Sequence, residues 1–560
     1  MKRVFAAGIS RIDPAIVALT ILAFGVASYR LGTKSLWLDE AYSADFARLG
    51  LSGLGKLVSG GNSLNAGGNG GLYFVLLNFW AHLFGYSETA LRSLTVLLGG
   101  LSVPVMVLLG TRLFSRGAGL VAGLLLALSP FFVHYEQTAR TYALVVLLVL
   151  LSSYFFVREM EQPSRARRVG FVLASSLAFY AHYFAAFVLL VQFLTLLAVK
   201  RRGAFTRDWL VAGGAIAILC APELLTVGGQ PAGTRYSTSL ISLSSALAGG
   251  GILLIALVIL ACYGLARAVA DRRLWPAGFV AAWFLVPVLL VFAISKHDPR
   301  LFNSYYLIVV LPALLLLAAA GLARLPGRAT GIITLGLLII CSGVGISDWY
   351  RQPPVNDYRA ATRYFLAHEQ PGDAVVYYPW WLRPGFAYYE ALAGRSDPTV
   401  APSGSPPKRI WLVLGGGAPP QQTEQFIGGA YTPVGMSPAS SSPSVYLYRT
   451  KSTPSTTQST SKVIGPNGVV PSAVAACLKA GGAQVQGPKP AGFGKAVYAV
   501  TPDSAVIGVF KAPNLDIAGY RQTFSSSGFQ IVPLKADPAA FGIIKGKATP
   551  VDLALLSRCT

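Results

Sequence analysis

Long apolar runs recur through the first 347 residues of the chain, and short polar segments separate them. An α-helix needs about 20 predominantly apolar residues to cross the hydrocarbon core of a bilayer. The pattern predicts a polytopic α-helical membrane protein with about eleven transmembrane helices, although several runs are shorter than this length. The predicted helices cover residues 14–31, 90–111, 117–133, 141–157, 169–181, 183–199, 209–227, 244–266, 275–294, 304–323 and 329–347.

Residues 71–86 form a further apolar, aromatic stretch that could either cross the membrane or lie flat on it. Cytoplasmic loops collect Lys and Arg, and this rule decides between the two arrangements. If the stretch crossed, every later basic cluster would face outward, so we expect an interfacial helix in the first outer loop and a cytoplasmic N-terminus. The clusters then facing inward are Lys2, Arg3 and Arg11; Arg112 and Arg116; Arg158, Arg165, Arg167 and Arg168; Lys200, Arg201, Arg202 and Arg207; Arg267, Arg272 and Arg273; and Arg324 and Arg328.

The pattern changes after Asp348, where shorter segments replace the apolar runs. They predict an amphipathic helix over residues 356–368 and strands over 374–378, 410–414 and 445–448. The expected organisation is a transmembrane domain over 1–347, an extracytoplasmic α/β module over 348–450, a Ser/Thr-rich linker over 451–464 and a second small α/β module over 465–560. The second module has predicted strands near 496–501, 505–511, 529–534 and 542–545.

Composition supports a membrane protein, because 53% of the residues are hydrophobic and only 12% are charged. The net charge of +23 follows from the inward-facing basic loops, so we expect no nucleic-acid partner. Cys220, Cys262 and Cys341 lie in apolar runs and are expected to be inert. Cys477 and Cys559 lie in the polar C-terminal part, where an oxidising compartment would allow a disulfide between them.

The outer end of the first apolar run carries adjacent carboxylates, Asp39 and Glu40. A carboxylate at the membrane boundary can accept a proton from a hydroxyl group or hold a cation. The competing interpretation is the start of a helix, where acidic residues are ordinarily favoured. The residues around the pair favour the catalytic interpretation.

Other reactive polar residues gather in the same outward-facing loops, and such clusters predict a site at the membrane surface. Each has a simpler interpretation: Arg140 could snorkel towards water, and His182 could be a satisfied interfacial histidine. The outer histidines and carboxylates leave a divalent cation possible, but the chain has no HExxH spacing, Walker sequence or GxSxG elbow. The candidates are Asn69, His134, Glu136, Arg140, Tyr142, His182, Tyr183, Lys296 and Arg300.

Several of these segments resemble GT-C glycosyltransferases, the superfamily of protein O-mannosyltransferases and aminoarabinose transferases. The segment 36–41 (LWLDEA) is similar to the Asp-Glu motif of the family's first loop, and 135–144 (YEQTARTYAL) is similar to its "SQEAR-x-YAL" stretch. Segments 71–93 and 181–184 also match in order and spacing. The resemblance covers roughly residues 10–375 and identifies the chain as a suspected member of glycosyltransferase family 39 or a close relative.

Two departures from the family pattern affect the expected site. Asn69 and two glycines stand where members carry Pro-Pro before the interfacial helix. Tyr305-Tyr306 stands where many members carry Arg-Tyr, so the cation for the donor phosphate has to come from elsewhere. Arg300 is the expected substitute, with Lys296 or Arg140 beside it.

The resemblance implies an inverting transfer of a sugar from a polyprenyl-phosphate donor to a hydroxyl of an envelope glycan, lipid or protein. The reaction would take place at the outer face of a bacterial cytoplasmic membrane, with Asp39 as the base and Glu40, His134 and Glu136 orienting the substrates. No cofactor is implied with certainty. Two alternatives are a transporter or flippase of a lipid-linked glycan, which explains the spans but not the ordered motifs, and a non-catalytic envelope scaffold.

Overall fold

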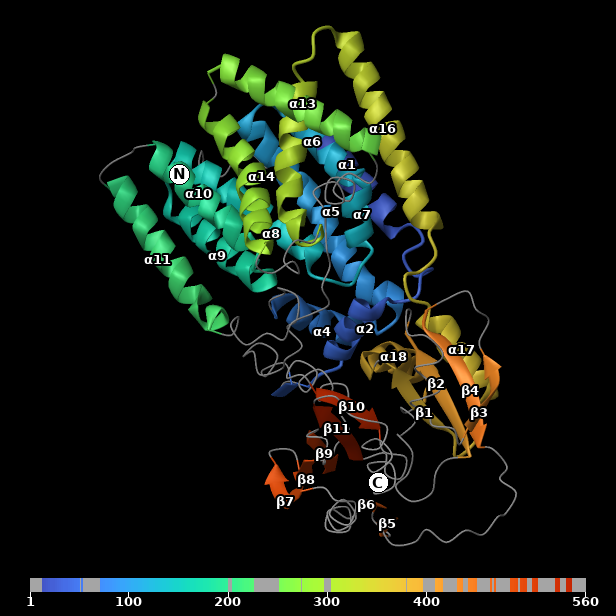
Figure 1. Ribbon diagram of the computed structural model, residues 1–560. Coiled ribbons are helices and arrows are strands. Elements are labelled where there is room, and N and C mark those ends of the chain that lie inside the picture. The colour runs from blue at the N-terminus through green and yellow to red at the C-terminus, as the bar shows by residue number, and fades with distance from the viewer. Residues whose placement is uncertain are drawn as a thin grey trace, which may run out of the picture. The chain divides into compact units, whose positions relative to one another are not determined.

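Two compact units make up the chain in the computed structural model, residues 1–359 with 391–395 and residues 360–390 with 396–560 (Figure 1). The residues that the structure describes are 13–50, 52–53, 71–199, 204–225, 251–272, 274–296, 304–378, 380–395, 408–415, 431–436, 442–450, 464–465, 468–469, 484–491, 494–500, 506–511, 529–533 and 540–545.

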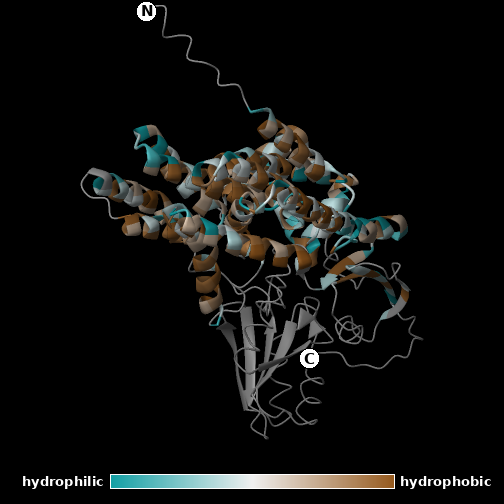
Figure 2. Ribbon diagram, turned by 90° about the horizontal axis from the view of Figure 1, so that it is seen from above, coloured by the Kyte–Doolittle hydropathy of each residue, from teal (hydrophilic) through white to brown (hydrophobic). Residues whose placement is uncertain are grey.

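The first unit is helical, and a helix lies in each region where the sequence predicts a transmembrane span. Figure 2 shows that apolar residues dominate these helices. The helices are α1 (Pro14–Ser28), α5 (Glu88–Leu113), α6 (Arg116–Ala127), α7 (Pro130–Glu136), α8 (Tyr142–Glu161), α9 (Arg165–Ala181), α10 (Ala185–Val199), α11 (Ala204–Leu224), α13 (Gly251–Ala270), α14 (Leu274–Ser295), the 3-10 helix η3 (Tyr306–Val310) continued by α15 (Leu311–Leu322), and α16 (Arg328–Arg351).

Five of the described helices, α5, α8, α13, α14 and α16, are long and apolar enough to cross a membrane, and the chain is a multi-pass membrane protein. A sixth span is possible if α6 and α7 form one bent span. These two helices meet at 58°, so the predicted single run over 117–133 is broken. Ser129 caps the N-terminus of α7, and Pro130 is its first residue. Proline is well suited to the first turn of a helix, so Ser129-Pro130 is a place where a new helix begins. The number of eleven crossings and the cytoplasmic N-terminus stay predictions.

The described part of the first loop contains two short helices, α2 (Leu38–Phe46) and α4 (Leu72–Phe84). Helix α4 occupies the stretch predicted to lie in the interface. It has 13 residues, fewer than the ~20 that cross a bilayer core, and it ends at Gly85 with a φ of 92°. Glycine adopts this left-handed conformation without steric cost, so the chain can turn sharply into α5.

Small residues let the helices of the first unit pack closely. Gly264 of α13 and Gly321 of α15 face each other so tightly that a Cβ on either would overlap the backbone of the other helix. Close approach at small residues is typical of helix pairs in membranes, where dispersion contacts replace the hydrophobic effect between helices. Helix α8 is buried over most of its length and forms the centre of the unit.

The second unit contains the sheets. One has the order β1-β2-β4-β3, with β1 (Ala374–Tyr378) parallel to β2 (Arg409–Leu414), and β4 (Ser444–Thr450) antiparallel to both β2 and β3 (Tyr431–Met436). Helices α17 (Tyr358–His368) and α18 (Arg383–Leu392) accompany it, and Phe365 of α17 packs on Trp411 of β2 with ring centroids 5.4 Å apart. The predicted strands over 374–378, 410–414 and 445–448 are therefore present.

A second sheet follows with the order β10-β11-β9-β8-β7, and β5 (Ile464–Gly465) pairs with β6 (Gly468–Val469). Four of its strands lie where the sequence predicts them, and β7 was not anticipated. The sheet's strands are β7 (Gln484–Ala491), β8 (Gly494–Val500), β9 (Val506–Lys511), β10 (Phe529–Pro533) and β11 (Ala540–Lys545). The predicted module boundaries stay predictions, and Cys477 and Cys559 lie outside the described residues.

Candidate functional site

Asp39 and Glu40 lie in the first turn of α2, so the helix-start interpretation describes their backbone correctly. Glu40 accepts a hydrogen bond from the backbone N–H of Trp37, the residue before the helix, at 3.3 Å. The two side chains nevertheless have very different surroundings. The side chain of Asp39 is 35% exposed, whereas that of Glu40 is 2% exposed.

Glu40 is held by a two-pronged ion pair with Arg92 of α5. The guanidinium donates from Nε to Oε1 at 2.8 Å and from Nη2 to Oε2 at 2.7 Å. The backbone N–H of Ala139 donates to the same carboxylate at 2.8 Å. A buried carboxylate with this many charge-assisted bonds is a fixed anchor between α2, α5 and the loop after α7.

Arg92 also fixes the segment that leads into α2. Its guanidinium donates to the carbonyl oxygens of Leu31 and Lys34 at 2.9 Å each and of Ser35 at 3.2 Å. The sequence pattern alone assigned Arg92 no role. The available signal was an arginine at the outer end of a predicted apolar span, because ionisable residues at membrane depth are costly and need a partner.

Asp39 faces Arg140 from the loop between α7 and α8. The Arg140 Nη2 atom lies 3.8 Å from Asp39 Oδ2, and Nη1 donates to the Asp39 carbonyl oxygen at 3.4 Å. Arg140 is only 6% exposed, so it does not snorkel. Its Nε has no hydrogen-bond partner among the described residues, which is costly for a buried donor.

The charge on Arg140 is secured by its neighbours. Burial lowers the pKa of Arg140, but the Asp39 carboxylate, together with Tyr142 and Tyr306, raises it above its ordinary value in sum. The guanidinium also lies over the ring of Phe74, 5.6 Å from its centroid. The site therefore holds a fixed positive charge beside a partly exposed carboxylate.

His182 lies near Arg140 in the turn between α9 and α10 and is fully buried. Its Nδ1 accepts a hydrogen bond from the backbone N–H of Phe184 at 3.2 Å. Burial and the Arg140 charge lower the pKa of His182 to about 3, so the ring is neutral near pH 7 and carries its proton on Nε2. That N–H finds no acceptor in the described part of the chain.

Tyrosine rings surround these two residues. Tyr142 lies 5.6 Å from Tyr305, and His182 lies 5.4 Å from Tyr306, measured between ring centroids. Tyr305 and Tyr306 stand where the family pattern has Arg-Tyr, so tyrosines border the site where an arginine was missing. The Arg140 cluster is defined here as Arg140, Tyr142, His182, Tyr305 and Tyr306.

The remaining predicted residues lie around this cluster or beyond the described ranges. His134 stacks on Trp349 of α16 with ring centroids 3.7 Å apart. Glu136 is 1% exposed, packs over Gly99 of α5, and neither oxygen has a hydrogen-bond partner within the described ranges. Tyr183 donates to Glu223 of α11 at 2.8 Å. Asn69 and Arg300 fall outside the described residues.

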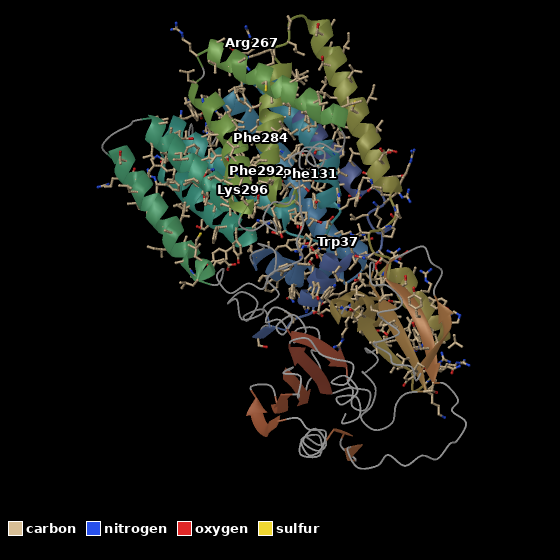
Figure 3. The ribbon with its side chains drawn as sticks, in the orientation of Figure 1. Trp37, Phe131, Arg267, Phe284, Phe292 and Lys296 are labelled. Atoms are coloured by element: carbon tan, nitrogen blue, oxygen red, sulfur yellow. The ribbon has the colours of Figure 1, made fainter. Side chains whose placement is uncertain are left out.

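Lys296 follows the last residue of α14 and is exposed, with its amine 5.7 Å from the centroid of the Phe292 ring. Figure 3 labels both residues, together with Trp37 at the start of α2. Among the described residues, no group of three His, Cys, Asp or Glu side chains is arranged to hold a metal ion.

Known proteins share parts of this sequence and this fold. Residues 71–225 match the family described as dolichyl-phosphate-mannose-protein mannosyltransferase. No curated protein matches the sequence. The structure of ArnT from Cupriavidus metallidurans in the apo state is similar with a TM-score of 0.55 and 14% identity over 77% of this chain and 97% of ArnT.

ArnT bound to undecaprenyl phosphate gives a TM-score of 0.56 and 16% identity over 78% of this chain and 98% of that one. The oligosaccharyltransferase AglB from Archaeoglobus fulgidus, in complex with a peptide and a dolichol phosphate, is more distant, with a TM-score of 0.47 and 12% identity over 71% and 69%. The chain thus has the fold of ArnT, and the predicted likeness to protein mannosyltransferases is confirmed over residues 71–225.

Proposed function

We propose that the chain is an inverting glycosyltransferase that moves a sugar from a polyprenyl-phosphate donor to an acceptor hydroxyl at the outer face of the cytoplasmic membrane. The single observation that carries this proposal is the pairing of a partly exposed Asp39 with a buried Arg140 at 3.8 Å. One group can accept a proton and the other can bind a phosphate, and the reaction needs both.

Arg140 is the proposed ligand of the donor phosphate. Its contact with Asp39 is long for an ion pair, and its Nε lacks a partner among the described residues, so it retains donors for a second anion. The free Nε2–H of His182 adds a neutral donor nearby. Undecaprenyl phosphate bound to ArnT, which shares this fold, agrees with a lipid-phosphate donor. Arg300, the expected main cation, and Lys296, expected beside it as an alternative to Arg140, become secondary candidates.

The proposed reaction is a single displacement at the anomeric carbon. The acceptor oxygen forms a bond to this carbon while the bond from the carbon to the phosphate oxygen breaks, which inverts the configuration. Asp39 accepts the proton of the acceptor hydroxyl, and the lipid phosphate leaves with the electron pair of the broken bond. Arg140 balances the negative charge of the leaving phosphate, so a general acid is not required.

Glu40 has a positioning role in this scheme rather than direct contact with substrate. Its carboxylate is already occupied by Arg92 and Ala139, and it holds the first turn of α2, which carries Asp39. Glu136, unlike Glu40, has no hydrogen-bond partner among the described residues, so its carboxylate is the one left to orient a substrate. The competing function is a transporter or flippase of a lipid-linked glycan.

The test is incubation of the purified full-length protein with polyprenyl-phosphate mannose or arabinose and with octyl mannoside or a Ser/Thr peptide as acceptor. Mass spectrometry should detect a glycosylated acceptor. Asp39→Asn should lower kcat by ~10²–10⁴-fold, the usual contribution of a general base. Asp45→Asn, on the exposed side of the same helix, is the matched control and should behave like the parent protein.

Two results would contradict the proposal. Near-parental kcat in a folded Asp39→Asn protein would remove the base role from this residue. Movement of an intact lipid-linked sugar across vesicles, with no transfer to any acceptor, would favour the transporter instead.

A further inference from the structure

Residues 356–359, just after α16, are held against the segment that carries Asp39. The side-chain oxygen of Asn356 accepts a hydrogen bond from the backbone N–H of Leu38, next to Asp39, at 3.2 Å. The backbone N–H of Arg359 donates to Ser35 Oγ at 3.3 Å. These bonds join parts of the chain that lie more than 300 residues apart in sequence.

The Arg359 side chain strengthens the same attachment. Its guanidinium contacts Glu88 at the start of α5 at 2.7 Å, and it donates to the carbonyl oxygens of Gly32 at 2.9 Å and Thr33 at 3.1 Å. Residues 356–359 are therefore a fixed part of the first unit and have a defined position beside α2.

Tyr358 lies between these two attachment points. It is fully buried, and its hydroxyl has no hydrogen-bond partner within the described chain. Buried hydroxyl groups are nearly always hydrogen-bonded, so an isolated one beside a proposed active site indicates a position that a ligand fills. Glu40, next to Asp39, and its partner Arg92 of α5 show the opposite condition, because their polar groups are hydrogen-bonded to each other.

Tyr358 and Arg140 have Asp39 as a common neighbour, but the other groups around them differ. Burial, and then the charges of Tyr42 and Asp39, raise the pKa of Tyr358. The pKa of Arg140 is raised by Asp39 too, but the tyrosines that raise it are Tyr142 and Tyr306. Burial, Asp39 and Asp45 raise the pKa of Tyr42 to about 12, so both tyrosines keep their hydroxyl protons near neutral pH. The Asp39 carboxylate is thus close enough to act on both the Arg140 guanidinium and the Tyr358 hydroxyl.

In an inverting displacement the incoming oxygen and the leaving phosphate lie on opposite sides of the anomeric carbon. With the phosphate at Arg140, the acceptor has to bind other groups near Asp39. The Tyr358 hydroxyl is such a group: it has no partner within the described chain, and its segment is held against Leu38. We propose that the Tyr358 hydroxyl binds the hydroxylated acceptor and orients it towards Asp39, with residues 356–359 holding Tyr358 in place. This inference rests on the proposed function.

Tyr358→Phe removes one oxygen and keeps the buried ring, so it tests the hydroxyl alone. Loss of one neutral hydrogen bond should raise the acceptor KM by ~3–10-fold. The donor KM, and the slow hydrolysis of the donor with water as acceptor, should stay within about twofold of the parent, because neither reaction uses the acceptor contact. A merely structural role would change all of these together.

Tyr263→Phe is the matched control, because its hydroxyl donates to the carbonyl oxygen of Arg324, just after α15, at 3.1 Å. An unchanged acceptor KM in Tyr358→Phe, with an active parent, would overturn the inference alone. A parent that transfers only to water would also overturn it. A parent that turns over no donor at all would remove the proposed function, and the inference with it.

Discussion

Asp39 and Glu40 are neighbours in sequence, yet the regions around them differ in how their buried polar groups are satisfied. Around Glu40, the guanidinium of Arg92 reaches a carboxylate and three carbonyl oxygens, and Ala139 adds a backbone N–H. Around Asp39, the Arg140 Nε, the His182 Nε2 and the Tyr358 hydroxyl have no partner among the described residues.

This difference suggests two roles: the region around Glu40 supports the fold, and the region around Asp39 is the proposed binding surface. A buried polar group that lacks a partner costs about 1–3 kcal/mol, so a fold keeps several of them together only where something outside the chain satisfies them. The occupied region around Glu40 keeps the first turn of α2 rigid. The unsatisfied region around Asp39 is where we propose that the substrates bind, because preorganised donors of this kind stabilise developing charge effectively.

Removing Arg92 should have the largest effect on the occupied region. Arg92→Met leaves the Glu40 carboxylate buried without its cation, and breaking one side of a buried pair costs about 3–5 kcal/mol. We expect a clear fall in thermal stability of the purified protein, measured by intrinsic fluorescence. Arg116→Met, which breaks an exposed contact with Asp13, is the control and should show no measurable change. Equal stability of both variants would show that the Glu40 region is not a scaffold.

Changing Arg140 should affect the unsatisfied region through activity rather than stability. Arg140→Lys keeps the charge but loses the fork that suits a phosphate. Loss of a charge-assisted hydrogen bond should lower kcat/KM for the donor by ~10–100-fold. Arg328→Lys, on the exposed first turn of α16, is the control. If Arg140→Lys melted like Arg92→Met while keeping its donor kinetics, the two regions would not differ as described.

The smallest expected effect concerns Lys34, which lies beside Arg92. Its amine stacks on Trp349 of α16, 3.2 Å from the ring centroid. Burial, followed by the charges of Arg92 and Arg30, lowers the pKa of Lys34 to about 8 from an ordinary 10.5. Between these two values the unfolded chain binds more protons than the folded one, so the contribution of Lys34 to stability rises with pH across this window.

Thermal unfolding at about pH 7.5 and about pH 9.5 tests this sign. The midpoint of the parent, relative to that of Lys34→Met, should increase by a few degrees at the higher pH. A parallel response of the two proteins would mean that Lys34 keeps an ordinary pKa and that the loop is more open to water than its burial indicates.

The sequence predicted the helical regions well because apolar runs long enough for a bilayer have few alternatives. It missed the break between α6 and α7, since hydropathy does not register the turn at Ser129-Pro130. It placed Asp39 and Arg140 in one outer site through the orientation of the loops. It could not reveal that Glu40 pairs with Arg92, or that Asn356 binds the backbone of Leu38 beside Asp39, because both depend on tertiary contacts across 52 to more than 300 residues.

The contact between Arg359 and Glu88 also bears on how the protein is made. These residues are 271 positions apart, so at ~5–20 residues per second a ribosome needs roughly 15–55 s between them. During that interval the first loop and α5 have been synthesised, but residues 356–359, which bind to this loop, have not. The proposed site is thereby completed only after near-complete synthesis of the membrane part, and a nascent chain stalled before residue 356 carries Asp39 without its finished surroundings.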